Sequence, residues 1–129
     1  MSDKFTVEII SPDQTISKQE TNEVIIPSFE GQMGILNNHI PLITFLRPGI
    51  LKIIGETNQL FFIEDGIVEF SNNKLLILTS TAKQLSDFNI DSLNLMIEDT
   101  QKKIAKNEIS DKEKYLLSFK MEVLKNITL

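Results

Sequence analysis

Glycine and proline are unevenly distributed along this chain of 129 residues: all five glycines and all four prolines lie at or before Gly66. Both residue types break helices and mark turns between short strands. Their distribution therefore divides the chain into an N-terminal region rich in turn signals and a C-terminal region without them. We place the boundary near residues 86–89, which predicts two domains, residues 1–86 and residues 87–129.

The N-terminal region consists of short apolar runs of strand length. Phe5, Val7 and Ile9 alternate with less apolar neighbours, as in a half-buried strand. Further strands are expected at residues 15–18, 23–27, 42–46, 50–54, 60–63, 67–70 and 75–78, the last two joined by a tight turn at Asn72–Asn73. Because no helix intervenes, we expect antiparallel pairing into a β-sandwich or flattened barrel.

The C-terminal region has helical periodicity. A first helix is expected from Asp91 to Lys106, with Asn89 or Asp91 as its N-cap. A second helix is expected from Ser110, which has capping-box spacing to Glu113. The short connector between them predicts an antiparallel α-helical hairpin.

Composition excludes several classes of function. The formal net charge is −5, and only one of the 13 basic residues is an arginine, so the basic face of a nucleic-acid-binding protein is not expected. The absence of cysteine excludes disulfides and thiolate metal sites. His39 is the single histidine, which argues against a histidine-rich metal centre. The chain shows neither a signal peptide nor an apolar run long enough to span a membrane.

Residues 24–53 carry the most informative pattern: an apolar strand, Glu-Gly-x-x-Gly-Ile-Leu, two turn residues, His-x-Pro-Leu and a later Pro-Gly. This pattern resembles the epsilon subunit of F-type ATP synthases, the equivalent of the mitochondrial delta subunit. The matching residues are Glu30, Gly31, Gly34, Ile35, Leu36, His39, Pro41, Leu42, Pro48 and Gly49. Residues 62–70 resemble a second family pattern. Two departures are Asn37–Asn38, where the family usually has Pro-Gly, and Asp65, where it usually has glycine.

The resemblance implies a non-catalytic central-stalk subunit of a rotary, proton-translocating ATP synthase. One face of the sandwich would grip the gamma subunit, and the loop end would meet the membrane ring. The implied rotor-interface residues, on what we expect to be a polar loop, are Glu30, Gly31, Gln32, Gly34, Asn37, Asn38 and His39. The simpler interpretation of the two glycines is a purely conformational role. The implied location is peripheral, at the cytoplasmic face of the bacterial inner membrane.

The hairpin region is rich in lysine but nearly neutral, with seven lysines and eight acidic residues between positions 87 and 129. A solvated helical surface is the simpler interpretation. The resemblance implies a second one, in which the hairpin contacts the alpha and beta subunits and slows ATP hydrolysis. The lysines implied in this contact are Lys102, Lys103, Lys106, Lys112, Lys114 and Lys120.

Some bacterial members of the family bind ATP through an Ile-Asp-x-x-Arg-Ala sequence on the hairpin. This chain keeps Ile90 and Asp91, but Asn94 replaces the arginine and the second helix has no arginine. We therefore expect ATP binding to be weak or absent, and no cofactor.

Two other classes of function stay open at this point. A free-standing β-sandwich module that binds a peptide or carbohydrate would need a formed pocket. A small enzyme would need its acidic and basic groups to converge in one cleft, and the candidates are Glu30, His39 and Asp65.

Overall fold

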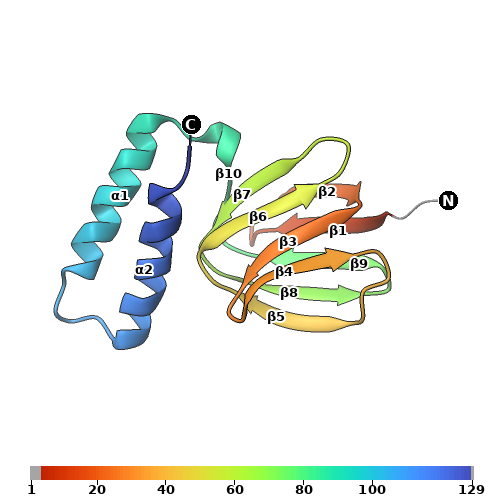
Figure 1. Ribbon diagram of the computed structural model, residues 1–129, viewed down its shortest axis with the longest axis horizontal. Helices are drawn as coiled ribbons and strands as arrows, with labels where there is room; N and C mark the ends of the chain where they lie inside the picture. Colours follow the sequence, from red (N-terminus) through yellow and green to blue (C-terminus); the bar gives the residue numbers. More distant parts are fainter. Residues whose placement is uncertain (1–3, 129) are drawn as a thin grey trace.

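The computed structural model describes residues 4–128 and contains a β-sandwich followed by a helical hairpin (Figure 1). The strands are β1 (Phe5–Ile10), β2 (Thr15–Thr21), β3 (Glu23–Ser28), β4 (Gly31–Leu36), β5 (Leu42–Leu46), β6 (Gly49–Ile54), β7 (Gln59–Ile63), β8 (Gly66–Ser71), β9 (Lys74–Leu78) and β10 (Ala82–Gln84). A 3-10 turn, Leu85–Asp87, leads to α1 (Ile90–Ile104) and α2 (Asp111–Lys125). The sandwich-plus-hairpin fold predicted from the sequence is confirmed.

One continuous sheet folds over to form the sandwich, in the order β10-β7-β6-β3-β5-β8-β9-β1-β2, with β4 paired to the outside of β3. The pairing is antiparallel as expected, with one exception. β1 and β9 run parallel, and β1 lies between β9 and β2. The chain between β1 and β9 forms strands β2 to β8, so this parallel pair needs no helical crossover.

Alternating side chains of the strands fill the interior between the two halves of the sheet. In β1, Phe5, Val7 and Ile9 are buried as predicted, and they pack with aliphatic and aromatic residues of β3, β6, β8 and β9. At the β8–β9 turn, Asn72 and Asn73 both have positive φ, at 52° and 56°. Asparagine tolerates this conformation, which two-residue hairpin turns require, so the predicted turn is confirmed.

The stretch expected to be a polar loop is instead strand β4, which pairs along its full length with β3. Gly31 begins the strand with a φ of 121°, which L-residues rarely adopt, so its conformational role is confirmed. The expectation of a loop was wrong because alternating glycines and polar residues suggest a turn. Backbone pairing with β3 and the fully buried Ile35, with Met33 packed against the same core, stabilise this strand.

Both helices begin at caps that the sequence predicted. The Asn89 side chain accepts a hydrogen bond from the backbone N–H of Ser92, and the Ser92 Oγ accepts one from the backbone N–H of Asn89, forming a capping box. Ser110 accepts from the backbone N–H of Glu113 and so caps α2. α1 ends two residues earlier than expected.

The hairpin stands against one end of the sandwich, with α2 between α1 and the sheet (Figure 1). A second, smaller apolar cluster joins the two parts: Phe62 of β7 packs with Phe88, Leu93 and Leu124. Neither helix within residues 4–128 is both long enough and apolar enough to cross a membrane.

Candidate docking surfaces

A row of apolar side chains crosses the outer face of four neighbouring strands. Strand register places Ile10 of β1 opposite Leu78 of β9, Leu78 opposite Ile67 of β8, and Ile67 opposite Phe45 of β5. We call these four residues the apolar row. Phe45, Ile67 and Leu78 are exposed to solvent. Since period-2 alternation should place polar residues on the solvated face of a sheet, an apolar row there indicates a surface that a partner covers.

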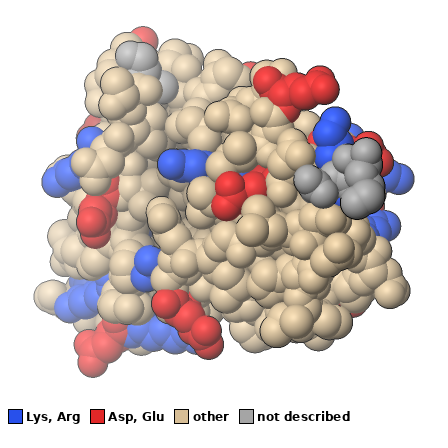
Figure 2. Space-filling model, turned by 45° about the vertical axis from the view of Figure 1, so that its right-hand side comes forward, with Lys and Arg blue, Asp and Glu red and all other residues tan. Residues whose placement is uncertain are grey.

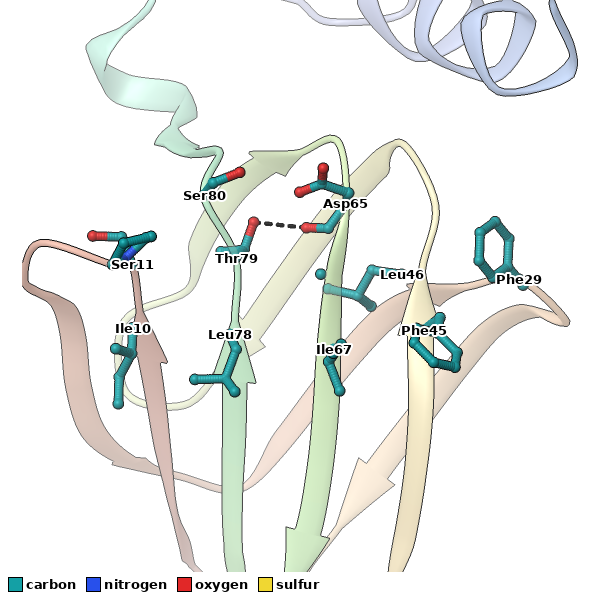
Figure 3. A pocket seen from close by; sticks show the side chains of 12 residues that line it. Ile10, Ser11, Phe29, Phe45, Leu46, Asp65, Ile67, Leu78, Thr79 and Ser80 are labelled. Carbon is teal, nitrogen blue, oxygen red and sulfur yellow. Dashed lines mark hydrogen bonds between the residues drawn. The ribbon is translucent and has the colours of Figure 1, made fainter. Parts of the chain in front are cut away.

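The apolar row lines a groove of about 720 Å³ near the hairpin end of the sheet (Figure 3). Phe29, from the β3–β4 turn, extends the groove, and its backbone N–H donates to the Phe45 carbonyl at 3.1 Å. Next to the two middle residues of the row, Leu78 and Ile67, Thr79 Oγ1 donates to the Asp65 carbonyl at 2.6 Å (Figure 3). Gly66 permits close packing at this point, because a Cβ there would lie 2.6 Å from the Leu78 carbonyl oxygen.

Few charges interrupt this side of the sandwich. Figure 2 shows a broad uncharged area at the lower right, over the part of the sandwich where β5 and β8 lie, while charged side chains crowd the hairpin. In the next row across the same strands, Glu69 faces outward between Ile43 and Leu76. On the other side of Leu76, Glu8 of β1 forms an ion pair with Lys74 at 3.3 Å.

The structure does not gather the seven rotor-interface residues into one loop. Because β3 and β4 are antiparallel, Glu30, Gly31 and Gln32 lie at one tip of the β3–β4 hairpin, and Asn37 and its neighbours lie beyond the other end of β4. Gly34 lies in the middle of β4, where a Cβ would approach the Glu23 carboxylate to 3.3 Å. Six of the seven residues therefore form two groups at opposite ends of one strand, and Gly34 lies between the groups.

The second group, Asn37–Asn38–His39, is held by Asn73, which the sequence predicted only as a turn residue. The Asn73 side chain bonds to both asparagines, at 2.7 Å each. The His39 ring lies edge-on against buried Phe70, with ring centroids 5.9 Å apart. Its Nδ1–H donates to the Ile40 carbonyl at 2.7 Å.

The six hairpin lysines are not equivalent. Lys102 and Lys103 form ion pairs within α1, with Glu98 and Asp99, each at 3.4 Å. Lys106, Lys112 and Lys114 are exposed. Lys120 differs from the others: its side chain is only 11% exposed, and its ammonium group lies against the Glu64 carboxylate of the sandwich. In this arrangement Lys120 faces the sandwich and not the outside of the hairpin.

The residues of the degenerate ATP motif lie at the start of α1. Ile90 is 59% exposed and Asp91 is also exposed. Asn94, one turn further along, is exposed as well. Neutral Asn94 supplies no cationic donor for a phosphate group, so the position does not restore the family's arginine.

The candidate enzyme residues do not converge. Asp65 immediately precedes β8, whereas His39 packs against Phe70 near the opposite end of that strand. Glu30 is separated from His39 by the length of β4. The positions of these three residues therefore do not support the alternative of a small enzyme, since adjacency in a sheet follows strand register and not residue type. Among residues 4–128, no cluster of His, Cys, Asp and Glu suited to a metal ion is found.

Comparison with known proteins gives a consistent result. The family model described as "ATP synthase, Delta/Epsilon chain, beta-sandwich domain" matches residues 4–85. Among curated relatives, the "ATP synthase epsilon chain" of Pelagibacter ubique is 42% identical, and the alignment covers 98% of this chain and 99% of that protein. The "ATP synthase epsilon chain" of Trichodesmium erythraeum is 34% identical over 83% of this chain and 79% of its own.

Solved structures share the fold. A chain in the cryo-EM structure of Euglena gracilis mitochondrial ATP synthase, which includes OSCP, F1 and the c-ring, superposes with a TM-score of 0.75. It is 19% identical, and the match covers 97% of this chain and 79% of that one. A chain in the central stalk/c-ring structure of Tetrahymena thermophila mitochondrial ATP synthase gives a TM-score of 0.68 at 15% identity, covering 93% and 92%. The matches to the family model and to the curated relatives together show that the chain belongs to the delta/epsilon chain family of ATP synthases.

Proposed function

We propose that this chain is a non-catalytic central-stalk subunit that links the gamma subunit to the membrane ring of a rotary, proton-translocating ATP synthase. The observation that carries the proposal is the apolar row. It lies on the outer face of the sheet and is not part of the sandwich's hydrophobic core. Gamma is the occupant of this face. Apolar side chains with few charges among them are typical of the centre of a lasting protein interface.

The ring contact is assigned to the tip of the β3–β4 hairpin. Glu30 and Gln32 are exposed there, and within residues 4–128 their side chains form no hydrogen bond or ion pair, so they are available to the polar loops of a ring. Asn37 and Asn38, in contrast, have polar groups already bonded to Asn73. The subunit would thereby sit peripherally at the cytoplasmic face of the bacterial inner membrane.

We further propose that residues 87–129 form a separate domain that slows ATP hydrolysis through contacts with the alpha and beta subunits. Lys106, Lys112 and Lys114 are exposed, and no ion pair engages them in the described part of the chain. They are the first candidates to meet an acidic partner surface. Lys120 can join them only if α2 separates from Glu64.

A matched pair of substitutions tests the gamma contact. Leu78 of the apolar row is 43% exposed and Leu95 of α1 is 66% exposed, so a lysine at either position reaches solvent without disturbing the core. Leu78→Lys is expected to weaken binding to the gamma-containing catalytic head at least about tenfold, since a charge buried in an apolar interface loses its hydration. Leu95→Lys is expected to bind as the unmodified chain does. Equal affinity of both variants would disprove the gamma contact at this face.

The brake is tested by ATP hydrolysis of the catalytic head with the full chain and with a form ending at Ser86. Circular dichroism of the short form first establishes that its strands are folded. Slower hydrolysis with the full chain alone would support the brake. Equal rates with both forms bound would restrict the subunit to coupling.

A further inference from the structure

Asn73 connects two turns that are far apart in the sequence. Its Oδ1 accepts a hydrogen bond from the backbone N–H of Asn38 at 2.7 Å. Its Nδ2 donates to Oδ1 of Asn37, also at 2.7 Å. Its own carbonyl accepts from the backbone N–H of Thr6 at 3.2 Å. One side chain therefore fixes the β4–β5 turn from the β8–β9 turn, 35 positions further along the chain.

Apart from Asn73, the turn is held by His39, whose ring packs on Phe70 and whose Nδ1–H donates to the Ile40 carbonyl. The turn is closed by a single backbone hydrogen bond from His39 to Leu36, at 3.1 Å, and Asn38 adopts a φ of 63°. The next residue, Ile40, is 74% exposed, and Ile43 on β5 is 71% exposed. Ile43 precedes Phe45 of the apolar row by two positions, so both side chains lie on the same face of β5. The turn thus continues the apolar face to the far end of the strands.

We propose that Asn73 is a positioning residue that holds the Asn37–Ile40 turn in the geometry that docks on gamma. This inference rests on the gamma contact proposed above and extends that contact beyond the apolar row. A turn that is ordered before binding loses less conformational entropy when a partner covers it. Ile40 is the large apolar side chain that the ordered turn presents.

Asn72 provides a matched control next to Asn73. Both residues are asparagines with positive φ, but within residues 4–128 no side-chain hydrogen bond is found for Asn72. Glycine adopts positive φ without strain. Asn73→Gly therefore removes the two side-chain hydrogen bonds and preserves the turn, while Asn72→Gly preserves both the turn and the hydrogen bonds.

The experiment measures two quantities for each full-length variant: the amide exchange rate of Asn38 and the affinity for the gamma-containing head. Asn73→Gly is expected to speed amide exchange at Asn38 at least about tenfold, because the backbone N–H loses its acceptor. It is also expected to weaken binding about three- to tenfold, which corresponds to the free energy of about one hydrogen bond. Asn72→Gly is expected to change neither. Asn73→Asp, which keeps the acceptor but loses the donor, is expected to give an intermediate affinity.

The outcomes separate this inference from the function on which it rests. One outcome is that Leu78→Lys weakens binding to the head but Asn73→Gly only speeds exchange at Asn38. This outcome would overturn the positioning role of Asn73 and leave the gamma contact intact. Unchanged exchange at Asn38 in Asn73→Gly would overturn the positioning role directly. Normal binding by both Leu78→Lys and Asn73→Gly would overturn both proposals. A loss of affinity in Asn73→Gly without a fall in the urea midpoint supports positioning over a purely structural role.

Discussion

The sandwich and the hairpin are held in place by different kinds of contact. The sandwich has a core of aliphatic and phenylalanine side chains drawn from strands throughout residues 5–77, most of them fully buried. The hairpin is attached through a small apolar cluster around Phe62 and Leu124, the Lys120–Glu64 ion pair, and the Arg47 guanidinium 4.2 Å from the Phe119 ring centroid. Charged contacts are weakened when water reaches them, whereas a closed apolar core is not. The sandwich is therefore suited to stiffness, and we expect any change of arrangement to be in the hairpin's position.

The largest effect is expected from a cavity in the sandwich core. Ile77 is fully buried, and Ile77→Ala is expected to lower the free energy of unfolding by about 2–5 kcal/mol. Urea unfolding followed by strand and helix signals checks this. Leu124→Ala, at a fully buried position of the hairpin, is the counterpart and is expected to release the helices first, while the strand signal keeps its midpoint. If the strand and helix signals of Leu124→Ala change at the same urea concentration, the sandwich and the hairpin unfold as one unit. That result would contradict the distinction drawn here between the two regions.

Loss of the buried ion pair should give the next largest effect. Lys120→Ala leaves the Glu64 carboxylate, 32% exposed, without its partner, and we expect hairpin attachment to weaken by about 1–2 kcal/mol. Amide exchange in α2, compared with exchange in the sandwich, measures this. Lys102→Ala is the control, because that ion pair is largely exposed and its loss should cost under about 0.5 kcal/mol. Similar effects of the two substitutions would show that burial adds nothing at Lys120.

The cap of α2 provides a test within the hairpin itself. Ser110→Ala removes the hydrogen bond to the Glu113 N–H and is expected to destabilise α2 by about 1 kcal/mol. Ser118→Ala, within the same helix, is expected to be neutral or slightly stabilising, since alanine has the higher helix propensity. Helix content on heating reports both, and a larger loss for Ser118→Ala would contradict the capping argument.

The smallest effect concerns the stacking of Arg47 on Phe119. Arg47→Gln is expected to weaken hairpin attachment by about 0.5–1 kcal/mol. Arg47→Lys, which keeps the charge but not the planar group, is expected to retain part of the attachment free energy that Arg47→Gln loses. The α2 exchange assay measures both variants, and equal loss in the two would assign the contact to planar stacking alone.

Local patterns predicted much of the fold and little of the surface. The alternation at Phe5, Val7 and Ile9 and the turn at Asn72–Asn73 could be read from adjacent residues, because strand alternation and positive φ are local properties. The parallel pairing of β1 with β9 could not, since it joins strands that are far apart in the sequence.

The functional surfaces depend even more on distant residues. Ile10, Ile67 and Leu78 form a row only once the strand register is known. A lysine such as Lys120, on an amphipathic helix, is expected at the solvated face; its burial follows from Glu64, on a different element. Asn73 was predicted as a turn residue, and its contact with the earlier turn had no local signal.

The parallel pairing of β1 with β9 also affects how the protein is made. β1 leaves the ribosome first, but its partner β9 (Lys74–Leu78) follows only after most of the sandwich has been synthesised. At about 5–20 residues per second, the first strand waits for some seconds with one edge unpaired. Until then Phe5, Val7 and Ile9 cannot be enclosed in the complete core. The nascent chain is therefore expected to engage chaperones during this interval, and to lose that affinity once residue 78 has emerged.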